Sequence, residues 1–172
     1  TSLNFGVYRR YTTDVVERIT TFQDNVSITI PQNIGINQTT GLELNFKTIP
    51  AKFMTITGDL NYNFFSREGE LEGTSFDFSA DQYSAKLTTK FNLPLDFDFE
   101  VTGQYQSAFL TVQSEVSDQL CADLGLRKKL FKGKGAVSFS VRDLFASRIQ
   151  ERVIDQVGVY QYNRRLRGRF IT

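Results

Sequence analysis

Hydrophobic and polar residues alternate along most of the chain, most clearly in two runs on either side of Pro94. In residues 83–91 the odd positions are mostly apolar and the even positions are polar or charged, and residues 97–105 repeat the alternation. Successive side chains of a β-strand point to opposite faces of its sheet. The two runs therefore predict a hairpin with one apolar face and one polar face.

The make-up of these two faces favours a membrane barrel over a soluble sandwich. The apolar face carries aromatic residues at its ends with small residues between them, and the polar face carries both signs of charge. Lipid-facing barrel strands with aromatic girdles at the two interfaces have this pattern. Tyr83 and Phe91, eight positions apart, would stand about 20 Å apart along the membrane normal in a tilted strand. That spacing is close to the ~25 Å apolar band of such barrels.

Further alternating runs predict strands throughout the chain, at about residues 3–11 (extending toward 19), 26–30, 36–48, 54–64, 120–127, 137–141 and 163–172. Asp24-Asn25 breaks the first pattern. Tight turns are predicted near Pro50, Pro94 and Gly133, and long polar loops at residues 66–78, 110–118 and 145–160. Short turns at one rim and long loops at the other are typical of bacterial outer-membrane barrels, whose short turns are periplasmic. The predicted fold is all-β, an antiparallel up-and-down meander of about eight strands that forms part of a transmembrane β-barrel.

Composition excludes several classes of function. The formal net charge is +1, which gives no preference for nucleic acid. The chain has no histidine and one cysteine, Cys121, so the commonest general base and metal ligand are absent and an internal disulfide is impossible. Asp98 and Glu100 share a strand face at about 6.5–7 Å, a spacing that glycosidases use, but a solvated lumen face explains them better. We expect no catalytic residues, no metal site and no cofactor.

Three short stretches resemble one family of membrane proteins. They are Gly41-Leu42-Glu43-Leu44, Val141-Arg142-Asp143-Leu144-Phe145 and the arginine-rich run 164–170. Together they resemble the carboxy-terminal barrel of TonB-dependent outer-membrane receptors, in particular those of the Bacteroidetes type. In such receptors the first stretch begins a long barrel strand and the second ends the penultimate one.

The resemblance implies that residues 1–172 are a fragment of a larger receptor in the bacterial outer membrane. It implies energised uptake of a scarce or large nutrient, with this piece supplying barrel wall, lumen lining and external loops. The implied partners are outer-membrane lipid, the remaining barrel strands and plug of the parent receptor, the TonB complex acting through the absent plug, and a surface lipoprotein. The first strand and the last, near residues 164–172, are expected to pair with chain outside this sequence.

The alternation also orients candidate site residues. The lumen-facing candidates, chosen by orientation only, are Asp59, Asn61, Lys86, Lys90, Asp98, Glu100, Gln104, Asp123 and Arg142. Arginines can bind phosphate groups such as those of lipopolysaccharide, which makes a possible anion contact of Arg164, Arg165, Arg167 and Arg169. A three-residue connection centred on Pro94 would place Lys90 opposite Asp98, with Lys86 diagonal to Glu100.

Two other interpretations stay open at this point. One is a small self-contained eight-stranded outer-membrane barrel with a structural or adhesive role. The other is a soluble β-sandwich or ligand-binding barrel with its apolar face inward. Burial of Leu87, Phe91, Phe99 and Val101 against a second sheet would favour the soluble interpretation.

Overall fold

The computed structural model describes residues 1–23, 26–71, 73–156 and 159–172. The predicted break at Asp24-Asn25 lies outside the described residues. Strands dominate, and one short 3₁₀ helix, η1 (Phe131–Gly133), is present. The strands are β1 (Ser2–Thr13), β2 (Val16–Gln23), β3 (Val26–Asn33), β4 (Ile36–Ala51), β5 (Met54–Leu71), β6 (Thr74–Leu93), β7 (Phe97–Gln106), β8 (Phe109–Leu110), β9 (Ser114–Val116), β10 (Gln119–Leu130), β11 (Gly135–Arg142), β12 (Ile149–Gln156), β13 (Val159–Leu166) and β14 (Phe170–Ile171).

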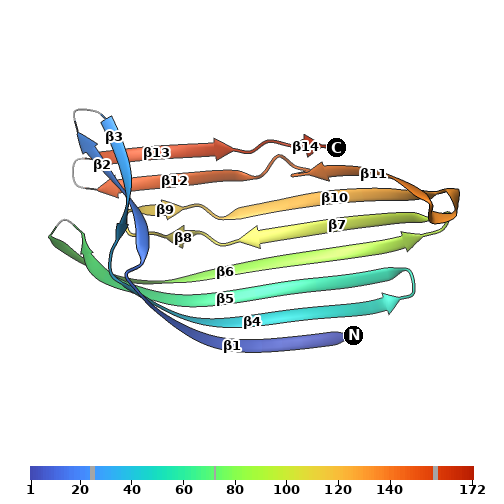
Figure 1. Ribbon diagram of the computed structural model, residues 1–172, viewed down its shortest axis with the longest axis horizontal. Helices are drawn as coiled ribbons and strands as arrows, with labels where there is room; N and C mark the ends of the chain where they lie inside the picture. The colour runs from blue at the N-terminus through green and yellow to red at the C-terminus, as the bar shows by residue number, and fades with distance from the viewer. Residues whose placement is uncertain (24–25, 72, 157–158) are drawn as a thin grey trace.

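Eight of the strands form one curved antiparallel sheet in the order β1-β4-β5-β6-β7-β10-β11-β14 (Figure 1). Two smaller sheets, β13-β12-β9-β8 and β2-β3, lie at the end of the molecule where the long connections gather. Neighbours in the main sheet follow one another along the chain apart from the small-sheet strands between them, so the predicted all-β meander is confirmed. Strands β1 and β14 lie at opposite edges and do not pair with each other.

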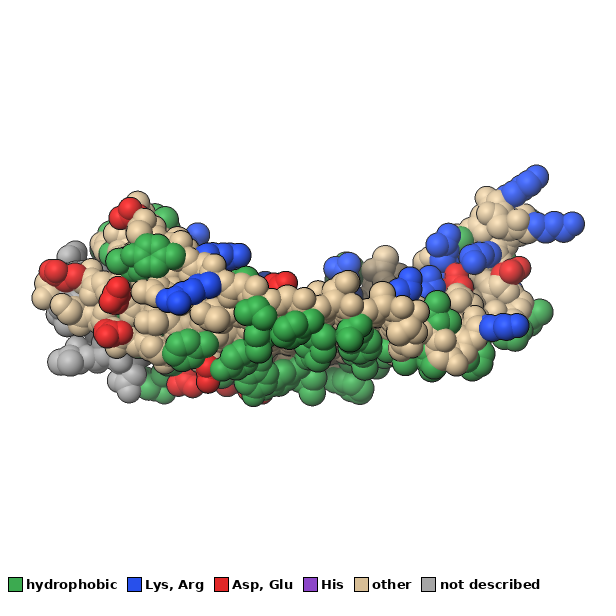
Figure 2. Space-filling view, turned by 90° about the horizontal axis from the view of Figure 1, so that it is seen from below, with side chains coloured by type: hydrophobic (Ala, Val, Ile, Leu, Met, Phe, Trp, Pro, Cys, Tyr) green, Lys and Arg blue, Asp and Glu red, His purple; other side chains and the backbone are tan. Residues whose placement is uncertain are grey.

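The apolar face of the main sheet is its convex side and is open to the surroundings (Figure 2). Leu87 in β6 is 49% exposed and Phe139 in β11 is 46% exposed. Phe91, Phe99 and Val101 are half-buried by neighbours within the same sheet. Among the described residues no second sheet covers this face, which argues against the soluble sandwich. Nor does any helix of the described chain have the length and apolar character needed to span a membrane.

Aromatic residues form a row at each end of the convex face. At one end the rings of Tyr83 and Tyr105 lie with their centroids 5.7 Å apart. At the short-turn end Phe91 lies opposite Phe99, with centroids 6.0 Å apart. Aromatic residues prefer the two interfaces of a bilayer, where a ring can meet both lipid and water. The two rows thus mark the limits of the apolar band.

Glycine is required at Gly58 because an aromatic ring lies over it. Gly58 pairs with Phe46 across strands β4 and β5, and a Cβ at Gly58 would clash with that ring. Gly103, on the same convex face, has open space where its Cβ would be. Close packing therefore requires glycine at Gly58 but not at Gly103.

This contrast predicts different effects of two glycine-to-alanine changes. Gly58→Ala should destabilise the folded protein by about 1–3 kcal/mol, because the Phe46 ring must move out of a packed position. Gly103→Ala should be neutral or mildly stabilising, since alanine costs less conformational entropy than glycine in a strand. Urea unfolding of both variants in lipid vesicles tests this, and equal losses would contradict the ring-over-glycine packing.

Three predicted loops are wrong because each of them contains paired strand residues. Strands β5 and β6 stay paired from Met54 and Phe91 out to Leu71 and Thr74, which converts most of the predicted loop 66–78 into a projecting ribbon. The predicted loops at 110–118 and 145–160 contain β9 and β12. The turn expected near Pro50 falls two to three residues later, at residues 52–53, because β4 continues through Pro50 with an irregular register between Thr48 and Ala51.

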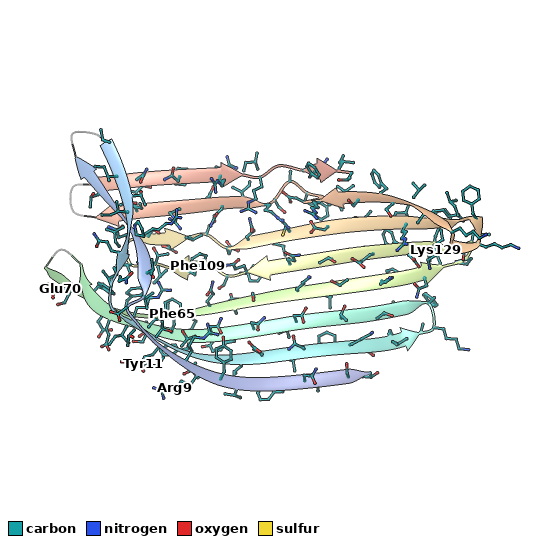
Figure 3. The ribbon with its side chains drawn as sticks, viewed as in Figure 1. Arg9, Tyr11, Phe65, Glu70, Phe109 and Lys129 are labelled. Atoms are coloured by element: carbon teal, nitrogen blue, oxygen red, sulfur yellow. The ribbon has the colours of Figure 1, made fainter. Side chains whose placement is uncertain are left out.

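The projecting part of the β5–β6 ribbon reverses the polarity of its faces. Its register continues unbroken, so Phe65 and Phe78 lie on the same face as the polar Asn61. Phe65 is buried and its ring meets Phe78 edge to face at 6.2 Å. On the other face, apolar residues give way to charged ones such as Glu70, seen at the tip of the ribbon in Figure 3. Once the ribbon leaves the lipid, its outer side faces water and its inner side carries the packed aromatic side chains.

Strands β1 to β4 are two halves of one long ribbon. Thr13 pairs with Ile36 at the end of the first half, and Val16 pairs with Asn33 at the start of the second. The register therefore passes through the junction without a shift. The predicted extension of the first strand toward residue 19 is interrupted only by this bend.

The bend turns the second half of the ribbon across the concave side of the sheet (Figure 1). We call this second half, residues 15–23 and 26–34, the strap. Asp14 (φ 52°) and Gly35 (φ 71°) supply the left-handed backbone at the bend. A Cβ at Gly35 would meet the backbone of β5 next to Gly69, so the ribbon crosses that strand with backbone nearly touching backbone.

The hairpin around Pro94 keeps the predicted faces but not the predicted register. The connection does contain three residues, yet its centre is Leu95, since Leu93 pairs with Phe97. Lys90 consequently lies opposite Glu100 rather than Asp98. Lys86 lies opposite Gln104 rather than diagonal to Glu100.

The predicted closing strand at 164–172 is also wrong, because it is divided between two sheets. Strand β13 pairs with β12, whereas β14 pairs with β11 through Val141 and Arg142. Gly168, with φ 73°, lies in the connection between the two strands. The edge of the main sheet is therefore a short strand at Phe170–Ile171.

Candidate functional site: the polar concave face

The concave face of the main sheet carries all nine lumen-facing candidates. Cross-strand pairs share a face, and the pairs Asp59 with Lys86, Lys86 with Gln104, and Lys90 with Glu100 connect the set across three strands. The remaining candidates follow from the same pairing on β5, β7, β10 and β11: Asn61, Asp98, Asp123 and Arg142. The backbone thus gathers on one surface residues that are up to 83 positions apart, from 59 to 142.

Two adjoining hollows of about 270 Å³ each lie over strands β6, β7, β10 and β11 of this surface. One is lined by Lys90, Asp98, Glu100, Gly125, Leu126, Arg127, Ser138, Phe139 and Ser140. The other is lined by Lys86, Glu100, Thr102, Gln104, Asp123, Leu124, Gly125, Ser140, Val141 and Arg142. A third hollow of about 400 Å³ contains Asp59 and again Lys86, toward the β1 edge.

Gly125 lies on the shared floor of the two central hollows. It sits between Glu100 on β7 and Ser140 on β11 and projects no side chain into the space. Neither Gly125 nor Arg127 was among the nine candidates, although both alternate along the strand in step with Asp123. That both residues line a hollow follows only from the pairing of β10 with β7 and β11.

Opposite charges face one another across these strands. Lys90 lies opposite Glu100, and Asp98 lies opposite Arg127. Lys129 forms a salt bridge with Asp98 at 3.3 Å near the short-turn end, where Figure 3 labels Lys129. Among the described residues no cluster of acidic and cysteine side chains is arranged to hold a metal ion. The surface is suited to binding polar solutes and water.

A few contacts hold the strap over the concave face at the end opposite to the short turns (Figure 1). Glu17 forms an ion pair with Arg67 of β5 at 2.5 Å. The side-chain amide of Gln113 bonds both backbone atoms of Thr20, accepting from its N–H at 2.8 Å and donating to its C=O at 3.2 Å. Ile19, between these contacts, is only 1% exposed.

Breaking the ion pair should loosen the strap. A half-buried pair of this kind contributes about 1 kcal/mol, so Arg67→Gln should raise the population of the open strap roughly fivefold. The reporter is Ile19→Cys, labelled with a membrane-impermeant maleimide on intact cells, with buried Cys121 as the unreactive reference. Arg9→Gln, on the exposed outer side of β1, should leave labelling unchanged.

Charge reversal makes this test specific. Arg67→Glu should increase labelling of the introduced cysteine, and adding Glu17→Arg should return it toward the starting rate. Labelling that is equally slow in every variant would contradict the idea that the ion pair holds the strap.

The stretch Val141 to Phe145 ends β11 and begins a turn that is organised around the buried Asp143. Asp143 is 1% exposed and accepts hydrogen bonds from the backbone N–H groups of Ser147 (2.8 Å) and Arg148 (2.9 Å). Its own N–H donates to Asp123 of β10 at 2.8 Å. Arg148 in turn lies 3.6 Å from the Asp123 carboxylate and donates to the sulfur of Cys121 at 3.3 Å. This network ends β11 and directs the chain into β12.

The four arginines proposed to contact an anion are not brought together. Arg164 forms a salt bridge with Glu151 at 3.4 Å, and Arg165 belongs to the opposite face of β13. Arg167 and Arg169 lie exposed in the connection to β14. Tyr162 donates to Glu151 at 2.7 Å, which raises the pKa of its phenol because the bond favours the protonated form.

An open, strongly curved sheet with a lipid-compatible convex face and a charged concave face defines the wall of a transmembrane β-barrel. The family comparison agrees. Residues 1–172 match the model of the outer membrane protein beta-barrel family, and the chain belongs to that family. Its location is therefore the bacterial outer membrane. The comparisons with curated proteins and with solved structures found no match.

Proposed function

We propose that this chain forms part of the barrel wall, lumen lining and external loops of a TonB-dependent receptor for energised nutrient uptake. The observation that supports this most directly is the open main sheet, with β1 and β14 at opposite edges. An unpaired strand edge in lipid costs several kcal/mol for each unsatisfied backbone group. Further strands of the same receptor would pair with both edges and close the barrel.

The charge on the concave face supports a wide barrel. An eight-stranded barrel is filled by its own inward side chains. Here the inward side chains of the central strands include Lys86, Lys90, Asp98, Glu100 and Arg127, which line open hollows. A wider barrel leaves these groups in water and leaves room for a plug and a solute.

This proposal gives each surface a partner. The convex face contacts outer-membrane lipid, and the short-turn end is periplasmic, where a plug would engage the TonB complex. The strap and the small sheets are external, where a surface lipoprotein could deliver cargo. The barrel itself carries out no chemical reaction in this scheme.

The test begins with the natural protein extracted from outer membranes. We expect one polypeptide that contains these residues and a plug-sized region before them, identified by mass spectrometry of the intact band. Uptake of its nutrient should stop when a protonophore collapses the proton gradient. A folded membrane polypeptide of only 172 residues would contradict the proposal and support the small barrel.

A further inference from the structure

The β12–β13 hairpin carries a second hollow region, separate from those of the main sheet. Its volume is about 570 Å³, and it is lined by Gln150, Arg152, Asn163, Arg164, Arg165 and Leu166. The sequence did not indicate the β12 half of this set, because residues 145–160 were predicted as a loop.

Four of these side chains form a square on one face of the hairpin. Gln150 pairs with Arg165, and Arg152 pairs with Asn163, two positions further along each strand. Directly opposed residues share a face and have their Cβ atoms about 5 Å apart. Two guanidinium groups therefore occupy one diagonal of the square, and two carboxamide groups occupy the other.

The square carries two positive charges, and in the described pairing of β12 with β9 and β13 no carboxylate lies opposite Arg152 or Arg165. Glu151 belongs to the other face, where it is bound to Arg164 and Tyr162. In the described part of the chain, neither Arg152 nor Arg165 forms a salt bridge. Both side chains are exposed, so their donors are available to a ligand.

The square faces the concave side of the molecule. Arg152 shares its face with Val116, to which it is paired, and with Ile154, and these two apolar side chains are buried. The strap crosses this end of the molecule on the concave side (Figure 1) and is bonded to Gln113, next to β9. The opposite face carries the exposed Tyr162 and Leu166.

We infer that Gln150, Arg152, Asn163 and Arg165 form a binding site for the anionic group, a carboxylate or a phosphate, of a soluble ligand that enters from the concave side. Guanidinium groups bind such oxyanions through two parallel hydrogen bonds. The carboxamide N–H groups add donors without adding charge. This inference adds a class of ligand to the proposed uptake role. The identification of that ligand as transported cargo rests on the proposed function.

Arginine footprinting on the full natural protein in outer-membrane vesicles tests this site without requiring transport. Phenylglyoxal modification of each arginine is followed by mass spectrometry in chloride, inorganic phosphate or acetate at equal ionic strength. Phosphate or acetate should slow the modification of Arg152 and Arg165 at least fivefold and saturably. Arg9, an exposed arginine outside the hollow, should show no such protection.

Two substitutions and a measurement with added lipopolysaccharide vesicles distinguish this site from non-specific protection and from lipid binding. Gln150→Ala should weaken the protection of Arg152 and Arg165, whereas Gln38→Ala, beside Arg9 and outside the hollow, should leave it intact. Equal protection of Arg9, or no protection by either anion, would overturn the site. Protection only by added lipopolysaccharide vesicles would overturn the soluble ligand. None of these outcomes bears on whether uptake is energised, so the two proposals can fail separately.

Discussion

Replacing Leu87 with lysine is expected to destabilise the folded protein in a bilayer by about 2–4 kcal/mol. Leu87 lies in the middle of β6 on the convex face, between the aromatic rows that contain Tyr83 and Phe91. At that depth a lysine side chain must leave water for hydrocarbon or distort the bilayer to reach the interface. Urea titration of the natural protein in lipid vesicles measures the loss.

Thr88 provides a matched control one residue away. Its side chain lies on the concave face, where its hydroxyl is 3.1 Å from that of Thr102. Thr88→Lys should cost less than about 1 kcal/mol, the value of a lost neutral hydrogen bond. Equal losses for the two lysines would mean that the faces are assigned wrongly. A larger loss at Thr88 would mean that the polar face is the packed one.

The alternation of residues predicted the fold well because a strand permits only two faces. Wherever one face meets lipid and the other meets water, composition alone orients each position, as at Leu87 and Thr88. The same rule places Asp98 and Glu100 on the concave face although their cross-strand partners were misassigned. The meander and the orientation of its side chains were therefore accessible from the sequence.

The rule fails where the surroundings change along a strand. Beyond Phe64 and Phe65 the ribbon leaves the apolar band and its outer face becomes polar, so this part of the continuous β5–β6 pairing had the composition of a loop. The strands of the strap were predicted near residue 19 and at residues 26–30, but its path across the sheet is missed for a related reason. Its bend at Asp14 and Gly35 depends on backbone contact with β5, and alternation carries no information about such long-range contacts.

The candidate site was predictable in its orientation but not in its grouping. Which concave residues share a hollow depends on register, and a shift of the turn centre from Pro94 to Leu95 changes the partner of Lys90. The square around Arg152 required the pairing of β12 with β13 as well. Period-2 alternation gives the face of a residue, whereas the turn geometry determines its neighbour.

Asp143→Ala is expected to release the turn between β11 and β12. The substitution removes the acceptor of the Ser147 and Arg148 N–H groups, and each half-buried donor left without a partner costs roughly 1–2 kcal/mol. Asp143 also has φ 54°, a conformation that aspartate tolerates better than alanine. The free energy of opening this turn should therefore fall by about 2–4 kcal/mol.

Hydrogen exchange at the Ser147 and Arg148 amides measures this opening directly, because local unfolding exposes both groups. Ser147→Ala is the control for the other contacts of the turn, since it removes the hydroxyl that donates to the Leu120 C=O at 2.6 Å and lies 3.3 Å from Asp143, and it leaves both N–H bonds to the Asp143 carboxylate in place. Asp143→Asn should give an intermediate effect, as it keeps one carbonyl oxygen and the same backbone preference. Amide exchange in Asp143→Ala as slow as in the parent protein would show that the other contacts of the turn hold it and that the Asp143 carboxylate contributes nothing.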